Sequence, residues 1–188
     1  DRRQRQMCIR DRGTLLASKI LGRLALSENC GVKVSEVHGM SQRGGSVITH
    51  VRVGDSVHSP MVALGGADYL ISFEALEAAR AACYLKPGGT AIVNTQHILP
   101  MPVITGAAAY PEDPLAALAS YRVESADALG IAVECGSQKA LNLVLLGMFS
   151  RHLPFEEAAW RDAIAACVPQ KTLEVNLAAF ARGRALMG

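Results

Sequence analysis

The sequence predicts an α/β fold: an open, mostly parallel sheet flanked by helices, with a β-hairpin and a helical C-terminal end. Two observations predict this class. Short apolar runs, typical of buried parallel strands, alternate with helical patterns up to residue 126, and the pattern after it is helical. Strands that alternate with helices form layered domains around a mostly parallel sheet. A chain of 188 residues is long enough for one such domain with a sizeable core.

Each strand is predicted from apolar alternation or a short apolar run, and each helix from apolar residues three or four positions apart. In the first helix Leu16, Ile20 and Leu24 are spaced by four, and Gly13-Thr14 offers a cap. The predicted strands are residues 32–37, 46–53, 68–73, 90–95 and 122–124. The predicted helices are residues 14–26, 74–85, 139–149, 154–167 and 172–186.

The hairpin is predicted at residues 46–59. Residues 46–53 alternate apolar and polar side chains, and Gly54-Asp55 then supplies a two-residue turn. The short segment 56–59 would be the returning strand. Further along, Lys86-Pro87-Gly88-Gly89 is expected to end the second helix.

Two later segments have an unusual composition. Four prolines surround residues 103–105, which are expected to be extended. The helix at 139–149 is apolar on nearly every side, so it must be buried all round. In a domain of this size, that means either a central core position or an interface between subunits, and both interpretations stay open.

The first twelve residues do not fit the pattern. They hold five arginines and only three apolar side chains, Met7, Cys8 and Ile9, so no strand is predicted before the first helix. In a doubly wound fold the first strand usually lies in the middle of the sheet. We therefore expect residues 1–12 to be a non-native or disordered tail, and residues 13–188 to form a single domain.

The positive net charge arises from this tail. The formal charge of the chain is +2, and residues 1–12 contribute +3 of it, so 14 basic and 15 acidic residues remain. This removes the main electrostatic argument for nucleic-acid binding. No apolar run approaches the roughly 20 residues that cross a bilayer, and none follows the basic N-terminus as in a secretory signal. We expect a cytoplasmic protein with neither nucleic acid nor membrane as partner.

The cysteines and histidines are scattered. None of the five cysteines lies within four residues of another, so the chain has no zinc or iron–sulfur spacing. The thiols are expected to be reduced and mostly buried. No nucleophile–base pair, carboxylate pair or phosphate loop can be assembled either, so no catalytic residue is assigned.

The segment SEVHGMSQRGGS, residues 35–46, is a candidate anion-binding loop. It follows a predicted strand, and open α/β sheets bind ligands beyond the carboxyl ends of their strands. Glycines let backbone N–H groups approach an anion, and Arg43 adds a planar guanidinium. The alternative is a glycine-rich bend with a solvated or paired arginine. The candidate substrate- or anion-binding residues are His38, Gly39, Ser41, Gln42, Arg43, Gly44, Gly45 and Asn94.

Three polar side chains at strand ends have competing interpretations. His38 could act as an acid or base near neutral pH, or serve as a hydrogen-bonded structural residue. Asn94 could face the ligand crevice, or cap a helix and bond a loop. Glu36 could be the ribose-binding acid of a dinucleotide fold, but this needs an upstream G-x-G-x-x-G that residues 8–13 do not supply.

Four segments resemble the indolepyruvate:ferredoxin oxidoreductase beta-subunit family, which corresponds to the gamma domain of pyruvate:ferredoxin oxidoreductases. They are GTLLASK at 13–19, SEVHGMSQRGGS at 35–46, YLKPGGT at 84–90 and VNTQ at 93–96. Residues 142–147 and 173–186 also fit. The family pattern has an apolar strand leading into Gly-x-Gly-Gly-Gln-Gly, which would end at Gly13. Residues 8–12 depart from it, so no function is carried over to that loop.

The resemblance implies an enzyme subunit that works in a hetero-oligomer. The reaction would be the oxidative decarboxylation of an aryl pyruvate with coenzyme A to an aryl-acetyl-CoA, with electrons passed to ferredoxin. Thiamine diphosphate, Mg²⁺ and [4Fe–4S] clusters would belong to the large alpha subunit, and none to this chain. The loop at 39–45 would lie toward the partner's active site. The alternatives are a stand-alone Rossmann-like nucleotide-binding or sensor domain, and a purely structural subunit.

Overall fold

The computed structural model describes residues 4–10, 14–38 and 47–186. Six strands form one sheet in the order β2-β3-β1-β4-β5-β6. The strands are β1 (Arg5–Arg10), β2 (Gly31–His38), β3 (Val47–Gly54), β4 (Ala67–Ser72), β5 (Leu85–Asn94) and β6 (Arg122–Ala126). The α-helices are α1 (Thr14–Ser27), α2 (Ala75–Ala81), α3 (Met101–Ile104), α4 (Ala128–Glu134), α5 (Leu141–Phe149), α6 (Glu157–Cys167) and α7 (Leu173–Ala185).

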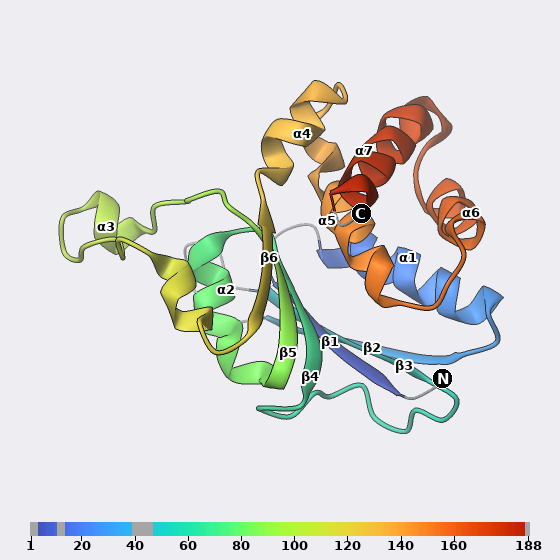
Figure 1. The fold of residues 1–188 in the computed structure, drawn as a ribbon, viewed down its shortest axis with the longest axis horizontal. Coiled ribbons are helices and arrows are strands. Elements are labelled where there is room, and N and C mark those ends of the chain that lie inside the picture. The colour runs from blue at the N-terminus through green and yellow to red at the C-terminus, as the bar shows by residue number, and fades with distance from the viewer. Residues whose placement is uncertain (1–3, 11–13, 39–46, 187–188) are drawn as a thin grey trace.

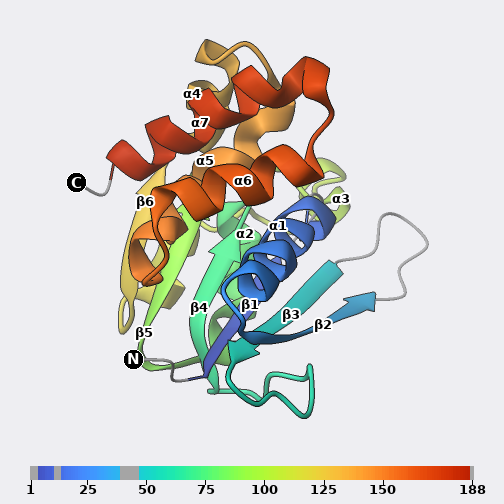
Figure 2. The ribbon, with the colours of Figure 1, turned by 90° about the vertical axis from the view of Figure 1, so that its right-hand side faces the viewer.

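Helices cover both faces of the sheet. Figure 1 shows α1, α5, α6 and α7 on one face and α2 on the other, and Figure 2 shows α1, α6 and α7 stacked over the strands. β1, β4, β5 and β6 pair in parallel, whereas β3 pairs antiparallel with both β1 and β2. The predicted α/β fold with a mostly parallel sheet and a helical C-terminal end is therefore confirmed. No helix within the described ranges is long and apolar enough to cross a membrane.

The N-terminal segment forms a central strand. The side chains of Met7, Cys8 and Ile9 are fully buried, and β1 pairs with β3 on one side and β4 on the other. The prediction that residues 1–12 are disordered is wrong for Arg5–Arg10. Three apolar residues suffice here because two neighbouring strands satisfy the backbone hydrogen bonds, while the polar residues lie near the strand ends. The interpretation of residues 1–12 as non-native stays a prediction.

The hairpin exists, but not where the turn signal placed it. β2 and β3 pair from Gly31 opposite Gly54 to His38 opposite Val47. The predicted hairpin across Gly54-Asp55 is wrong, because residues 56–59 are not a strand. β2 and β1 already occupy both edges of β3, so a strand returning at Gly54 has no edge to pair with.

Helix α5 lies in the core of the domain. Every residue from Leu143 to Phe149 is buried, and all of them except Gly147 belong to one apolar cluster with α1, α6 and α7. This confirms the core interpretation of the apolar helix and overturns the interface one. A smaller apolar cluster lies on the other face of the sheet, under α2, and includes Leu70 and Leu118.

Two predicted segments differ in detail. Residues 101–104 form the short helix α3 rather than an extended segment, since Pro100 is its N-cap and Pro102 lies in its first turn, where proline is tolerated. The second helix ends at Ala81 and continues as a 3-10 turn to Tyr84, before Lys86-Pro87-Gly88-Gly89. Those four residues instead lie inside β5.

Candidate functional site

The carboxyl ends of the strands other than β3 share one edge of the sheet, where the antiparallel β3 begins. The register runs across five strands from Val37 to Ile48, Arg10, Ser72 and Val93, so β1, β2, β4 and β5 end at the same level. Residues 39–46 join His38 to Val47 at this edge. Gly39, Ser41, Gln42, Arg43, Gly44 and Gly45 lie outside the described residues, as does the side chain of His38. Their binding role stays a prediction, and the topology fixes only where the loop begins and ends.

Asn94 is the last residue of β5, and its side chain links the ends of β4 and β5 to α4 at the carboxyl edge. Its side chain is fully buried. Nδ2 donates to the carbonyl oxygen of Phe73 at 3.0 Å and to Oε1 of Gln96 at 3.4 Å, while Oδ1 accepts from the N–H of Ala128 at 3.0 Å. These bonds tie the ends of both strands to the start of α4. They favour the capping interpretation of Asn94, and its role in ligand binding stays a prediction.

Glu74 is the buried carboxylate of this edge. Only 2% of it is exposed, and it is the N-cap of α2, with Oε2 accepting from the N–H of Glu77 at 2.8 Å. Its Oε1 accepts from the Tyr110 hydroxyl at 2.8 Å and from the N–H of Ile98 at 3.2 Å. One carboxylate therefore holds a helix start and two points of the segment that follows β5.

Tyr110 is held from two sides. Its ring lies 5.2 Å from the ring of His97, and its hydroxyl donates to Glu74. Burial, followed by this hydrogen bond and the nearby carboxylate, raises the pKa of Tyr110. The hydroxyl is therefore a permanent donor rather than an acid–base group at neutral pH. Sequence reasoning missed the pair, because 36 residues separate the partners and no local motif links them.

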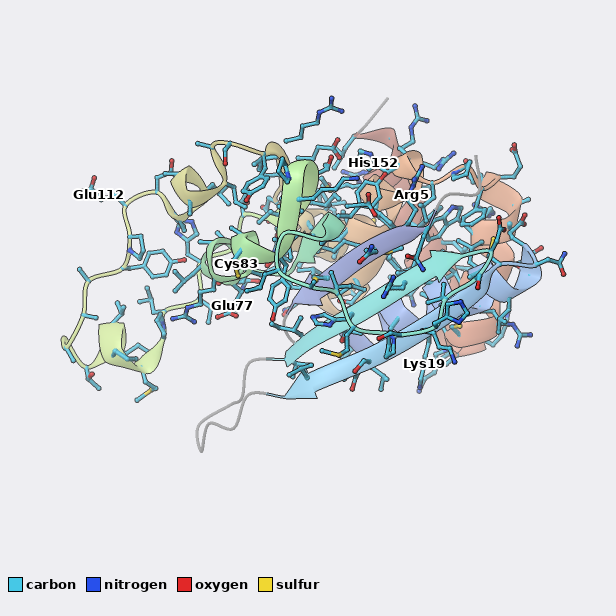
Figure 3. All side chains as sticks on the ribbon, turned by 90° about the horizontal axis from the view of Figure 1, so that it is seen from below. Arg5, Lys19, Glu77, Cys83, Glu112 and His152 are labelled. Atoms are coloured by element: carbon cyan, nitrogen blue, oxygen red, sulfur yellow. The ribbon has the colours of Figure 1, made fainter. Side chains whose placement is uncertain are left out.

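A polar hollow of about 250 Å³ lies at the opposite edge, where β4, β5 and β6 begin. Figure 3 shows two of its lining residues, Arg5 and His152, next to each other. Lys86 in this hollow pairs with Asp68, and His152 Nε2 lies 2.8 Å from Glu124 Oε2. The hollow is thus separated from the carboxyl edge, where β2 ends and β3 begins, by the length of the strands.

Two buried titratable groups, Cys8 and His50, have pKa values shifted toward their uncharged forms. Burial, with Cys83 nearby, raises the pKa of the Cys8 thiol to about 12, so it is protonated at neutral pH. All five cysteines are free thiols, as predicted, but only Cys8 is fully buried. Burial also lowers the pKa of His50, whose Nδ1 accepts from the N–H of Val62 at 3.3 Å. Within the described residues, no three His, Cys, Asp or Glu side chains form a group that could hold a metal ion.

Residues 12–186 match the family described as Pyruvate ferredoxin/flavodoxin oxidoreductase. The chain belongs to this family. It is 40% identical over 178 residues to the indolepyruvate oxidoreductase subunit IorB of Thermococcus kodakarensis, covering 91% of this chain and 88% of the relative. IorB of Archaeoglobus fulgidus is 38% identical over 177 residues, with the same coverage. The family resemblance seen in the sequence is therefore confirmed, and the chain is a subunit of a 2-oxoacid oxidoreductase.

Solved structures of the oxidoreductase family share the fold. The gamma subunit of a keto/oxoacid ferredoxin oxidoreductase from Geobacter sulfurreducens superposes with a TM-score of 0.73 at 20% identity, over 97% of this chain and 98% of that one. A 2-oxoglutarate:ferredoxin oxidoreductase from Magnetococcus marinus gives 0.74 at 16% identity. It is matched over all of this chain but only 31% of its own. The same fold thus occurs as a separate subunit and within a longer chain.

Proposed function

We propose that this chain is the small subunit of a cytoplasmic indolepyruvate, or aryl 2-oxoacid, ferredoxin oxidoreductase. The observation that carries the proposal is its 35–40% identity to four IorB subunits over 91% of the chain. The enzyme would oxidatively decarboxylate an aryl pyruvate with coenzyme A. The products are the aryl-acetyl-CoA and CO₂, and two electrons pass to ferredoxin.

The small subunit would share this work with a large alpha subunit. We assign thiamine diphosphate, Mg²⁺ and the [4Fe–4S] clusters to that partner, where decarboxylation and electron transfer would take place. This chain would contribute residues 39–45 to the shared active site, with Arg43 and backbone N–H groups binding an anionic group of the substrate or of coenzyme A. β2 ends and β3 begins at the carboxyl edge, and this supports the assignment, since α/β sheets bind ligands there.

Assembly is tested by an activity assay. The isolated chain should not reduce ferredoxin with indolepyruvate and coenzyme A, and should bind no iron. Mixed with the large subunit, it should give activity well above that of the large subunit alone. A large subunit that is fully active by itself would leave only a structural role for this chain. Tight NAD binding by the isolated chain in calorimetry would instead favour a nucleotide-binding domain.

The role of the loop is tested at Arg43. A hydrogen bond to a charged group contributes about 1.5–3 kcal/mol, so Arg43→Ala should lower kcat/KM by roughly ten- to a hundredfold. Arg43→Lys should recover part of the loss, because it keeps the charge but not the planar pair of donors. Lys33→Ala, which removes an exposed cation from β2, is the matched control. An unchanged kcat/KM for both Arg43 variants would favour the alternative interpretation, in which the loop is a glycine-rich bend without a binding role.

A further inference from the structure

The segment between β5 and β6 carries an exposed apolar arm, residues 97–110. Figure 1 shows α3 standing away from the sheet, and Figure 3 places Glu112, just beyond the arm, far from the strands. No Asp, Glu, Lys or Arg occurs from residue 96 to residue 111. Its large apolar side chains are roughly half exposed: Ile98 50%, Leu99 51%, Met101 45% and Ile104 61%.

The arm is held in one conformation although its tip is exposed. Glu74 accepts hydrogen bonds from Ile98 and Tyr110, near the two ends of the arm. Within it, the N–H of Val103 donates to the carbonyl oxygen of Pro100 at 2.9 Å, and that of Ala107 to Pro102 at 2.8 Å. An exposed surface fixed in this way loses little conformational entropy when a partner covers it.

Composition and position together indicate what covers the arm. An apolar cluster without charges matches the centre of a protein interface, which is depleted of charged residues. A helix that binds a lipid surface usually carries Lys or Arg beside its apolar face, and residues 96–111 carry none. The arm leaves β5 at the carboxyl edge, the edge at which residues 39–46 begin and end. A protein bound to the arm would therefore lie beside that edge.

We propose that the arm docks into an apolar groove of the large, thiamine-diphosphate-binding subunit. This inference rests on the proposed function, because the partner is the one assigned there. In the Magnetococcus marinus protein the same fold makes up 31% of the chain, so there it is joined to further parts of one polypeptide. The arm would hold the carboxyl edge of this chain, with its glycine-rich loop, against the partner's active site.

The test compares two charge-inserting double variants in complex formation with the large subunit. Leu99→Asp with Ile104→Asp places carboxylates at the arm. Leu26→Asp with Leu64→Asp places them at positions that are 64% and 69% exposed and lie away from the carboxyl edge. Interface anchors often change affinity by about thirtyfold or more each. We expect the arm variant to weaken the dissociation constant by at least that factor, and the control variant to bind like the wild type.

Further measurements distinguish a failure of the docking proposal from a failure of the proposed function. Thermal unfolding should be the same for both variants, and a photo-crosslinking amino acid at Ile104 should label the large subunit without any loss of folding. Wild-type affinity of the arm variant, or crosslinking only to a second copy of this chain, would overturn the docking proposal alone. A wild-type chain that does not bind the large subunit would overturn the proposed function and this inference together.

Discussion

Gly147 of α5 and Gly183 of α7 lie at the point where the two helices cross, and neither position has room for a methyl group. A Cβ on Gly147 would lie 2.2 Å from the carbonyl oxygen of Phe180, and one on Gly183 would lie 2.0 Å from that of Val144. Both obstacles are backbone atoms, which cannot move without separating the helices. This contact fixes the helical layer that covers one face of the sheet.

Alanine at either glycine should destabilise the fold. Overpacking a core costs about 1–3 kcal/mol, and a clash with helix backbone belongs at the top of that range or above it. We expect Gly147→Ala and Gly183→Ala each to lower the free energy of unfolding by about 3 kcal/mol or more in urea titrations. Gly22→Ala in α1 is the control, because a Cβ there meets nothing within 4 Å. It should stabilise the protein by up to about 1 kcal/mol through helix propensity.

Replacement of Asn94 distinguishes a structural from a binding role. Asn94→Ala leaves the N–H of Ala128 and the carbonyl of Phe73 without their partner, so stability should fall by about 1–3 kcal/mol. Thr95→Ala, at an exposed neighbour, should change little. If Asn94→Ala instead folds like the wild type and only raises KM in the complex, Asn94 binds substrate and the capping interpretation is wrong.

Removal of the Tyr110 hydroxyl should loosen the arm without unfolding the domain. Tyr110→Phe removes one of the two hydrogen bonds from the arm to Glu74, and a bond to a charged group contributes about 1.5–3 kcal/mol. We expect thermolysin, which cleaves before large apolar residues, to cut the Val103–Ile104 bond roughly ten times faster or more, at an unchanged melting temperature of the core. Tyr121→Phe serves as the control. Equal cleavage rates in both variants would show that Glu74 does not hold the arm.

His50 should make stability depend on pH in the weakly acidic range. Burial lowers its pKa below the ordinary value of 6.5, so the unfolded chain binds the proton first as pH falls. Stability from the neutral ring is complete above pH 6.5 and is lost as pH falls toward the folded pKa. The slope for one group reaches at most about 1.4 kcal/mol per pH unit. His50→Gln, whose side-chain oxygen can accept from Val62, should have a shallower slope below pH 6.5 and no added slope at pH 8.

The local sequence pattern predicted those helices and strands whose own residues indicate that they are buried. The apolar residues of α5 on every side predicted a helix buried all round, and the alternation in β2 and the apolar run in β4 predicted strands. β1 was missed because its central position comes from pairing with β3 and β4, and only Met7, Cys8 and Ile9 indicate burial.

The site was predictable only where a short motif marks it. The glycine-rich segment at 39–45 is visible in the sequence, and the strand order places the strand ends on either side of it, at His38 and Val47. Glu74 gave no such signal, since glutamate is not a favoured N-cap and its partner Tyr110 is distant in the chain. Gly54-Asp55 has the composition of a hairpin turn, but no hairpin forms there. The residues of a turn carry no information about which strand edges are free for pairing.

The shared carboxylate of Glu74 makes α2 and the arm one cooperative unit. Its two oxygens accept from Glu77, Ile98 and Tyr110, so any motion that releases one donor weakens the geometry of the other two. Single substitutions will therefore not show how much each of the three hydrogen bonds of Glu74 contributes to stability. A double-mutant cycle between positions 74 and 110 should give a coupling energy well away from zero. In native-state hydrogen exchange, the amides of Glu77 and Ile98 should open in the same event, although one begins a helix and the other lies in an arm.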